Sequence, residues 1–387
     1  MDQPKDGERW SELDGIRGMA ACVVVIYHFY FLIQNTVPTW IQWTLTLTPL
    51  YLFVSGLEAM LTFFLISGFV LSLPYHRRPD RLDYPGFLIR RISRIYLPYL
   101  AALILAITGN AFFHGLKIND WFNQTWAERI NPETVVQHVL FIGNYNYSAF
   151  NAAFWTLVFE MRISLVFPFL CILVIRLGWV RSLILALGSI LLGKGLGMVG
   201  LPLQTTYTFR VVAIFIAGIL LAKFLFTNRE SLTKLRPIVR HGVLLISLML
   251  YLFAHLVPNA VEEGFVIVGG CGIIFSALAE PAFSRILRLS VFQFFGRLSY
   301  SIYLVHIPIL YLLVYLFHQR VPLGWLFLPF VLCVLAASVV FYHLVINPSV
   351  NLGRRLAKSL GSKAKALEKV TVEASPAGYT PQVKGVD

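Results

Sequence analysis

The chain has 387 residues, of which 57% are hydrophobic and only 13% charged, and its mean hydropathy is +0.72. Soluble domains carry about 25% charged residues, so this composition excludes a soluble globular protein and indicates an all-α, polytopic membrane protein. The net charge of +13 does not indicate nucleic-acid binding, because the basic residues fall between apolar segments and no stacking aromatics are interleaved with them.

Ten apolar segments are long enough to cross a bilayer. No secretory signal peptide precedes them, so we expect the first to act as an uncleaved signal anchor. A shorter segment, TVVQHVLFIG at 134–143, is expected to be interfacial or re-entrant. The predicted spans are residues 14–34, 50–74, 95–113, 154–176, 181–200, 207–227, 239–257, 263–282, 297–317 and 323–346.

The basic residues divide unequally between the two sides of this predicted bundle. The termini and loops of one side hold 26 of the 32 Lys and Arg residues, and the opposite loops hold Lys117, Arg129 and Arg320. The positive-inside rule therefore places both termini in the cytoplasm. We expect an N-terminal segment at 1–12, a transmembrane domain at 13–350 and a basic cytoplasmic tail at 351–387. The first part of the tail is expected to form an interfacial helix, and its last part to be disordered.

Several residues inside the spans are expected to be structural. Lys194 and Arg210 lie near helix ends, where long basic side chains usually reach the interface. The four cysteines lie in apolar segments and are interpreted as small core residues, neither disulfide partners nor metal ligands. They are Cys22, Cys171, Cys271 and Cys333.

Two ionisable residues within spans indicate a polar site. His28 lies 14 residues past Asp14, the expected N-cap of the first helix, which is about 21 Å into a core about 30 Å thick. Glu160 lies about 8 Å below the outer end of its span. Because charged groups in lipid are costly, we hypothesise that both face one polar cavity at the same depth. The alternatives are a structural, hydrogen-bonded His28 and a Glu160 that only pairs with Arg162 or Arg210.

Arginines gather at the cytoplasmic end of the predicted bundle. Arg17 lies near the start of the first span, and Arg91 and Arg94 share one helix face in FLIRRISRIYLPYL. They form either an ordinary positive-inside cluster or a clamp for phosphate, whose oxygens match the guanidinium fork. Ser67 and Gly68, at the cytoplasmic end of the second span, indicate either helix packing or close approach to a ligand.

Two more residues within spans fit a polar pathway. His306 lies near mid-membrane, shortly before Pro308, which interrupts the helical hydrogen bonds. Glu58, in the outer half of the second span, is a weaker candidate for a lining residue. Arginines at the cytoplasmic mouth, with a histidine and a carboxylate near the outer mouth, suit a phosphate-rich donor entering from the cytoplasm and an acceptor arriving from outside.

Five segments in chain order carry these residues: ELDGIRGMAACVVVIYHF, FFLISGF, FLIRRISRIYLPY, FWTLVFEMRISLVFP and GRLSYSIYLVHIPI. Their marked residues are Arg17 and His28, then Arg91 and Arg94, then Trp155 and Glu160, and finally Tyr300, Tyr303 and His306. In this order and spacing they resemble the motifs of the acyltransferase-3 family of integral membrane O-acyltransferases, over roughly residues 10–350. The chain departs from the family pattern at Leu61, Arg162, Ser164 and Asn347.

The resemblance implies transfer of an acyl group, acetyl by family habit, from cytoplasmic acyl-CoA to a hydroxyl on the outer side, usually of a carbohydrate. Acyl-CoA would be a co-substrate, with no bound cofactor or metal, and membrane lipid would surround the domain. The implied acyl-CoA site consists of Arg17, Arg91, Arg94 and Ser67. The implied acceptor or pocket lining consists of Trp155, Tyr303 and His306.

We hypothesise that His28 and Glu160 are the catalytic residues. A sugar hydroxyl is a poor nucleophile, so His28 would remove its proton, while Glu160 would orient the imidazole and stabilise the imidazolium. An acyl-histidine intermediate is the alternative chemistry. A transporter that relays protons or substrate past His28, Glu160 and His306 is the alternative function, and it would consume no thioester. A scaffolding subunit would leave the depth-matched histidine and glutamate unexplained.

Overall fold

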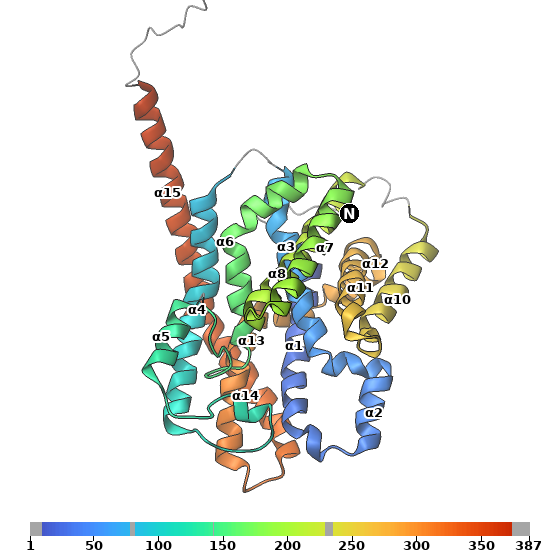
Figure 1. Cartoon of the computed structure of the whole chain (residues 1–387), viewed down its shortest axis with the longest axis vertical. Coiled ribbons are helices and arrows are strands. Elements are labelled where there is room, and N and C mark those ends of the chain that lie inside the picture. Colours follow the sequence, from blue (N-terminus) through green and yellow to red (C-terminus); the bar gives the residue numbers. More distant parts are fainter. Residues whose placement is uncertain (1–9, 78–81, 142, 229–234, 374–387) are drawn as a thin grey trace, which may run out of the picture.

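The computed structural model describes residues 10–77, 82–141, 143–228 and 235–373, and within these ranges every regular element is a helix. Most of the longer helices run side by side as a bundle (Figure 1). The α-helices are α1 Ser11–Ile33, α2 Thr39–Leu47, α3 Gly56–Arg77, α4 Tyr84–Phe112, α5 Pro132–Leu140, α6 Phe154–Arg176, α7 Trp179–Met198, α8 Leu203–Thr227, α10 Pro237–Leu252, α11 Asn259–Ala279, α12 Pro281–Leu287, α13 Ser290–Phe317, α14 Phe327–Phe341 and α15 Asn347–Glu373.

Nine helices in the described ranges are long and apolar enough to cross a membrane, and each corresponds to a predicted span. The tenth predicted span, 239–257, corresponds to α10, a shorter apolar helix of 16 residues. α10 stops early because the chain leaves the α-helix at Phe253 and makes a 3₁₀ turn over Ala254–Leu256. These apolar helices make the chain an integral, multi-pass, all-α membrane protein.

Two helices begin well away from the predicted edges. α4 starts at Tyr84, not at residue 95, because Asp83 accepts a hydrogen bond from the Gly86 backbone N–H at 3.0 Å and Pro85 occupies the first turn. α3 starts at Gly56, after α2 and a 3₁₀ helix, Pro49–Val54. Neither α2 nor this turn was predicted, because the whole stretch is apolar and hydropathy cannot divide it.

The segment predicted at 134–143 packs against the middle of α4. It contains α5, whose C-terminal carbonyls accept hydrogen bonds from the middle of α4: Tyr96 to Val139 at 2.5 Å and Tyr99 to His138 at 3.0 Å. The chain then reaches the middle of α13, where the Asn151 side chain donates to the carbonyl of Leu304 at 3.1 Å. α6 therefore begins half-way along the bundle and not at its outer end.

The first and last parts of the domain are joined by unusually close backbone packing between α1 and α13. A Cβ added to Gly18 would lie 2.6 Å from the backbone nitrogen of Gly296, and one added to Gly296 would lie 2.3 Å from the carbonyl oxygen of Asp14. Only glycine fits at either place without moving a backbone. This packing fixes the start of α1, which carries Arg17, against α13, which carries His306.

The C-terminal segment continues the last span. α14 passes through a π-helical turn, Tyr342–Ile346, directly into α15, which runs beside α4 and projects beyond the other helices (Figure 1). The two helices approach closely at Gly353 of α15, since a Cβ added there would lie 2.5 Å from the Cβ of Ser93 on α4. The prediction of a separate interfacial helix is therefore wrong, and the predicted disorder concerns residues that lie largely outside the described ranges.

The cysteines agree only in part with their predicted role as core residues. Cys171 is buried, Cys22 and Cys271 are half-buried, and Cys333 is exposed on the surface of α14. The sequence could not separate these cases, because a lipid-facing surface is as apolar as a core.

Candidate active site

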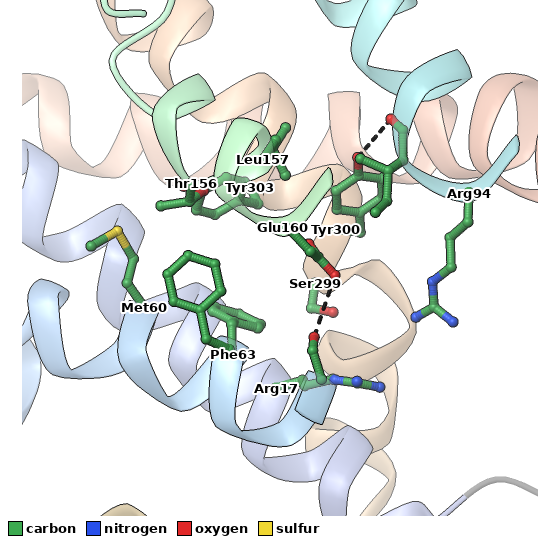
Figure 2. Close-up of a pocket in the computed structure, with 13 residues that line it drawn as sticks. Arg17, Met60, Phe63, Arg94, Thr156, Leu157, Glu160, Ser299, Tyr300 and Tyr303 are labelled. Atoms are coloured by element: carbon green, nitrogen blue, oxygen red, sulfur yellow. Dashed lines mark hydrogen bonds between the residues drawn. The ribbon is translucent and has the colours of Figure 1, made fainter. Parts of the chain in front are cut away.

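A cavity lies between α1, α3, α4, α6 and α13 and encloses about 650 Å³, including the open space at its mouth. Figure 2 shows Arg94 at one end of it and Met60 and Phe63 towards the other. Five of the predicted site residues line this cavity: Arg17, Ser67, Arg94, Glu160 and Tyr303. The remaining lining residues are Met60, Phe63, Phe64, Ile95, Thr156, Leu157, Ser299 and Tyr300.

Glu160 is held by an arginine of the neighbouring helix. Nη2 of Arg91 lies 2.5 Å from Oε1 of Glu160, and both side chains are largely buried. Ser67 donates to the same carboxylate oxygen at 3.3 Å. Nε of Arg91 donates to Ser164 at 3.0 Å, and Ser164 in turn donates to the Glu160 backbone carbonyl at 2.7 Å. The pair is thus charge-neutral and hydrogen-bonded on both sides, as a buried ion pair must be.

This arrangement corrects the predicted pairing of Glu160 with His28. The carboxylate contacts Arg91 and Ser67, and the histidine lies elsewhere. The depth argument failed because it placed the start of α6 at the outer surface. Since α6 begins beside Leu304, in the middle of α13, Glu160 lies farther towards the cytoplasmic side than His28.

His28 pairs instead with His306. Nε2 of His306 lies 3.1 Å from Nδ1 of His28, and that same Nδ1 lies 2.9 Å from the carbonyl oxygen of Val24. Nδ1 of His306 lies 3.1 Å from the carbonyl oxygen of Ile302. Two neutral rings satisfy all three contacts when each carries its proton on Nδ1. His28 then donates to Val24 and His306, and its Nε2 keeps a lone pair for a substrate.

Tyr303 lines the cavity and packs against the histidine pair. The ring of Tyr303 lies 5.8 Å from that of His306 and 6.2 Å from that of Phe63. Its hydroxyl is 2.5 Å from that of Thr156 and 2.7 Å from the carbonyl oxygen of Ala153, to which it donates. The cavity therefore ends against Tyr303, one helical turn from His306.

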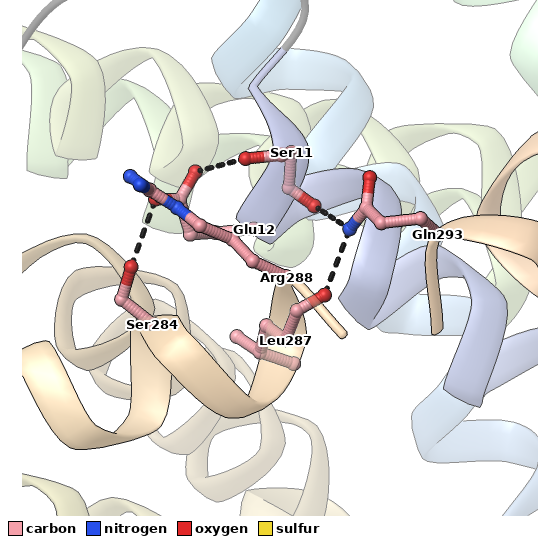
Figure 3. Close-up of polar contacts among 6 residues, drawn as sticks. All are labelled: Ser11, Glu12, Ser284, Leu287, Arg288 and Gln293. Atoms are coloured by element: carbon pink, nitrogen blue, oxygen red, sulfur yellow. Dashed lines mark hydrogen bonds and ion pairs between the residues drawn. The ribbon is translucent and has the colours of Figure 1, made fainter. Parts of the chain in front are cut away.

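The cytoplasmic end of α1 is fastened to the segment that joins α12 and α13 (Figure 3). Glu12 accepts from Ser284 at 2.9 Å and from Nε of Arg288 at 2.7 Å. Gln293 donates to the backbone carbonyls of Ser11 and Leu287, each at 2.7 Å. These contacts hold the first turn of α1, so that Arg17, one and a half turns later, is presented to the cavity. Arg17 also pairs with Asp14 at 3.7 Å.

Some predicted residues do not reach the cavity. Trp155 packs on Tyr207 and Phe159, with ring centroids 5.7 Å from each. Glu58 is fully buried and accepts from the Tyr51 hydroxyl at 2.7 Å, so it is not a lining residue.

The two partners suggested for Glu160 are engaged elsewhere. Arg210 pairs with Glu263 at 2.9 Å. Arg162 donates to Thr208 and to the Gly143 carbonyl. The alternative in which Glu160 pairs with either arginine is therefore wrong.

Two residues of the site were missed as site residues. Ser164 accepts a hydrogen bond from Arg91, and the Trp121 ring packs at a tilt against His28, with ring centroids 5.5 Å apart. Ser164 was noted only as a departure from the family pattern, although it follows Glu160 by one helical turn and so shares its face. Trp121 lies in a loop, and a single sequence does not indicate where such a loop folds back.

Comparison with known proteins identifies the family of this chain. The family model described as an acyltransferase domain, Acyl_transf_3, matches residues 10–343. A curated relative, the peptidoglycan O-acetyltransferase OatA of Listeria monocytogenes, is 24% identical over 325 residues, which cover 77% of this chain and 49% of the relative. The chain thus spans about half the length of that relative. No solved structure matches the chain. Because the family model covers most of the chain, this multi-pass membrane protein belongs to the acyltransferase-3 family and is an acyltransferase enzyme.

Proposed function

We propose that the enzyme transfers an acyl group, namely acetyl, from cytoplasmic acyl-CoA to a hydroxyl of a carbohydrate or glycosylated acceptor on the outer side. One observation carries this proposal: a single cavity has Arg17 and Arg94 in its lining and ends at a tyrosine packed on a histidine pair. The name of the Listeria relative, a peptidoglycan O-acetyltransferase, supports both the acetyl group and the carbohydrate acceptor.

The donor would bind at the arginine end of the cavity. Guanidinium groups match phosphate oxygens in charge and geometry, and CoA is rich in phosphate. Arg91 is engaged with Glu160, and Arg17 and Arg94 contribute two further guanidinium groups to the lining. In this proposal Glu160 shapes the cavity wall and keeps Arg91 in place, while Ser67 lies beside the bound donor.

The chemical step would take place at Nε2 of His28. This nitrogen accepts the proton of the acceptor hydroxyl while the hydroxyl oxygen attacks the thioester carbonyl carbon. The carbon–sulfur bond then breaks, and CoA leaves as the thiol with the proton that His28 held. Throughout, Nδ1–H donates to Val24 and His306, which orients the ring and stabilises the imidazolium between the two proton transfers. An acyl-histidine route would use the same Nε2.

Tyr303 would act as the inner gate. It stands between the cavity and His306, so the thioester reaches His28 only when this side chain shifts. Until then the two sides of the membrane stay separated, which prevents hydrolysis of the donor by external water.

The test is CoA release by the purified enzyme in sealed vesicles, with labelled acetyl-CoA on the cytoplasmic side and oligosaccharides on the other. We expect release that depends on the acceptor. Replacing Arg94 by Gln should raise the acyl-CoA KM about 10- to 100-fold, because a charge-assisted hydrogen bond contributes about 1.5–3 kcal/mol. Arg90→Gln is the matched control, since Arg90 lies one turn away and pairs with Asp83 at the surface. An enzyme that binds no acyl-CoA would contradict the proposal.

A further inference from the structure

The turn of α13 that carries His306 is interrupted by a proline. The nitrogen of Pro308 has no hydrogen and cannot donate to the carbonyl four residues earlier, that of Leu304. Leu304 is fully buried, so bulk water does not replace the missing donor. His306 lies between these two residues in the chain. The orientation of its ring therefore depends on how the interrupted turn is closed.

Asn151, in the segment before α6, supplies a donor to this turn. Its Nδ2 donates to the Leu304 carbonyl at 3.1 Å, and its Oδ1 accepts from the Ala153 backbone N–H at 2.9 Å. These partners determine which end of the amide is the nitrogen, because a carbonyl only accepts and an N–H only donates. Asn151 is itself fully buried, and its backbone carbonyl accepts from the Phe154 N–H at 3.0 Å. The side chain is thus fixed at both ends.

The preceding residue of α13 binds the same segment. The Tyr303 hydroxyl donates to the carbonyl oxygen of Ala153 at 2.7 Å. Two consecutive residues, Tyr303 and Leu304, therefore attach this turn of α13 to the start of α6. Nε2 of His306 lies 3.1 Å from Nδ1 of His28, so a small shift of the turn would change the contact within the histidine pair.

We propose that Asn151 is a positioning residue for the histidine pair. Its amide replaces the helical hydrogen bond that Pro308 removes, and so it fixes His306 at hydrogen-bonding distance from His28. Asparagine suits this role because one side chain combines a donor for the α13 carbonyl with an acceptor for its own chain. The inference rests on the proposed function, in which His306 orients the base His28. It assigns Asn151 no contact with either substrate.

Removal of the proline tests the proposal, because it restores the helical donor. In Pro308→Ala, residue 308 regains an N–H that can close the turn to Leu304, so Asn151 becomes dispensable. We expect Asn151→Ala to lower kcat for CoA release about 10-fold and to leave the acyl-CoA KM unchanged, because small displacements of catalytic groups are costly. In the Pro308→Ala background, the same substitution should lower kcat by less than about 2-fold.

Asn110→Ala is the matched control. Asn110 is also buried, but it lies on α4, and its Nδ2 donates to the backbone carbonyl of Glu128 at 3.2 Å. The substitution therefore removes a comparable amide hydrogen bond without touching α13. It should lower the melting midpoint in detergent and leave kcat at the wild-type value.

A measurement without catalysis separates this proposal from the proposed function. Nitrogen-15 NMR of labelled histidine rings in lipid reports the hydrogen bond between Nδ1 of His28 and Nε2 of His306. The two rings are assigned by the loss of their signals in His28→Ala and His306→Phe. We expect Asn151→Ala to shift both signals in the wild-type background but not in the Pro308→Ala background. Asn110→Ala should leave them unchanged.

Two results would overturn the proposal: wild-type kcat and ring signals in Asn151→Ala, or an equal effect of Asn151→Ala with and without Pro308. An equal loss of kcat in Asn110→Ala would also overturn it, because that pattern marks general destabilisation. Absence of acetyl transfer by the wild type, with ring signals that still depend on Asn151, would refute the proposed function and leave the hydrogen-bond replacement standing.

Discussion

At the scale of single residues, the sequence located the polar groups within the spans but did not indicate how they pair. Glu160 was expected beside His28, yet it binds Arg91, and His28 binds His306. Both errors have one cause. Helical spacing places residues on a face of their own helix, whereas pairing between helices depends on where each helix begins. Because α6 begins within the bundle, a depth counted from the outer surface was wrong for Glu160.

The buried Arg91–Glu160 pair gives the first prediction. Arg91→Met or Glu160→Gln alone should lower the free energy of unfolding by about 3–5 kcal/mol, because each leaves an unpaired polar or charged group in the bundle. The double variant should lose less than the sum of the two single losses. Thermal melting in detergent checks this order, and strictly additive losses would show that the two side chains do not stabilise each other.

The histidine pair gives the second prediction. His306→Phe should lower kcat about 100-fold and leave the acyl-CoA KM unchanged, because His28 loses an acceptor that orients its ring. His306→Gln should recover part of the rate, since the amide oxygen accepts the same hydrogen bond. Steady-state measurement of kcat and KM for CoA release by the wild type and both variants checks this prediction. Equal rates in the Phe and Gln variants would mean that His306 only fills space.

At the scale of elements, hydropathy located the spanning helices well and their ends poorly. It recognised the apolar stretch of α4 but not its first turns, which the Asp83 cap and Pro85 define. The hydropathy pattern included the 3₁₀ helix before Gly56 in the span of α3, and it did not indicate α2. The apolar content of a segment indicates whether it is stable in lipid. Helix ends depend on capping groups and tertiary contacts, which a hydropathy average does not measure.

The glycine contact between α1 and α13 gives the third prediction. Gly18→Ala should destabilise the enzyme by about 1–3 kcal/mol, because the new methyl meets the backbone of α13, which cannot yield without separating the helices. The matched control is Gly188→Ala on α7, where an added Cβ meets nothing within 4 Å. Melting in detergent should show a lower midpoint for Gly18→Ala only, and equal midpoints would refute this packing argument.

At the scale of the whole molecule, the sequence predicted the fold class, the family motifs and the order of most spans. Its ten-span count corresponds to nine long helices and the shorter α10 in the described ranges. The cavity could not be predicted, because its lining comes from five helices that lie far apart in the sequence. Arg17, Arg94 and Ser67, which the family resemblance grouped in one site, do line it, whereas Trp155 does not.

The predicted orientation gives the fourth prediction. In a variant without its four cysteines, Lys117→Cys should react with an impermeant maleimide added outside right-side-out vesicles, whereas Lys358→Cys should react only after permeabilisation. Both lysines are exposed, so access to the reagent depends only on the side of the membrane. Labelling of Lys358→Cys from outside would reverse the orientation and place the arginines at the external mouth.

The central claim is that His28 activates the acceptor hydroxyl for transfer from acyl-CoA. The most direct measurement is single-turnover CoA release from acetyl-CoA, with acceptor present, by the wild type and by His28→Ala. The account predicts that the variant binds acetyl-CoA normally but releases CoA at least about 100-fold more slowly, because it lacks the general base. Release at close to the wild-type rate by a well-folded His28→Ala enzyme would contradict it.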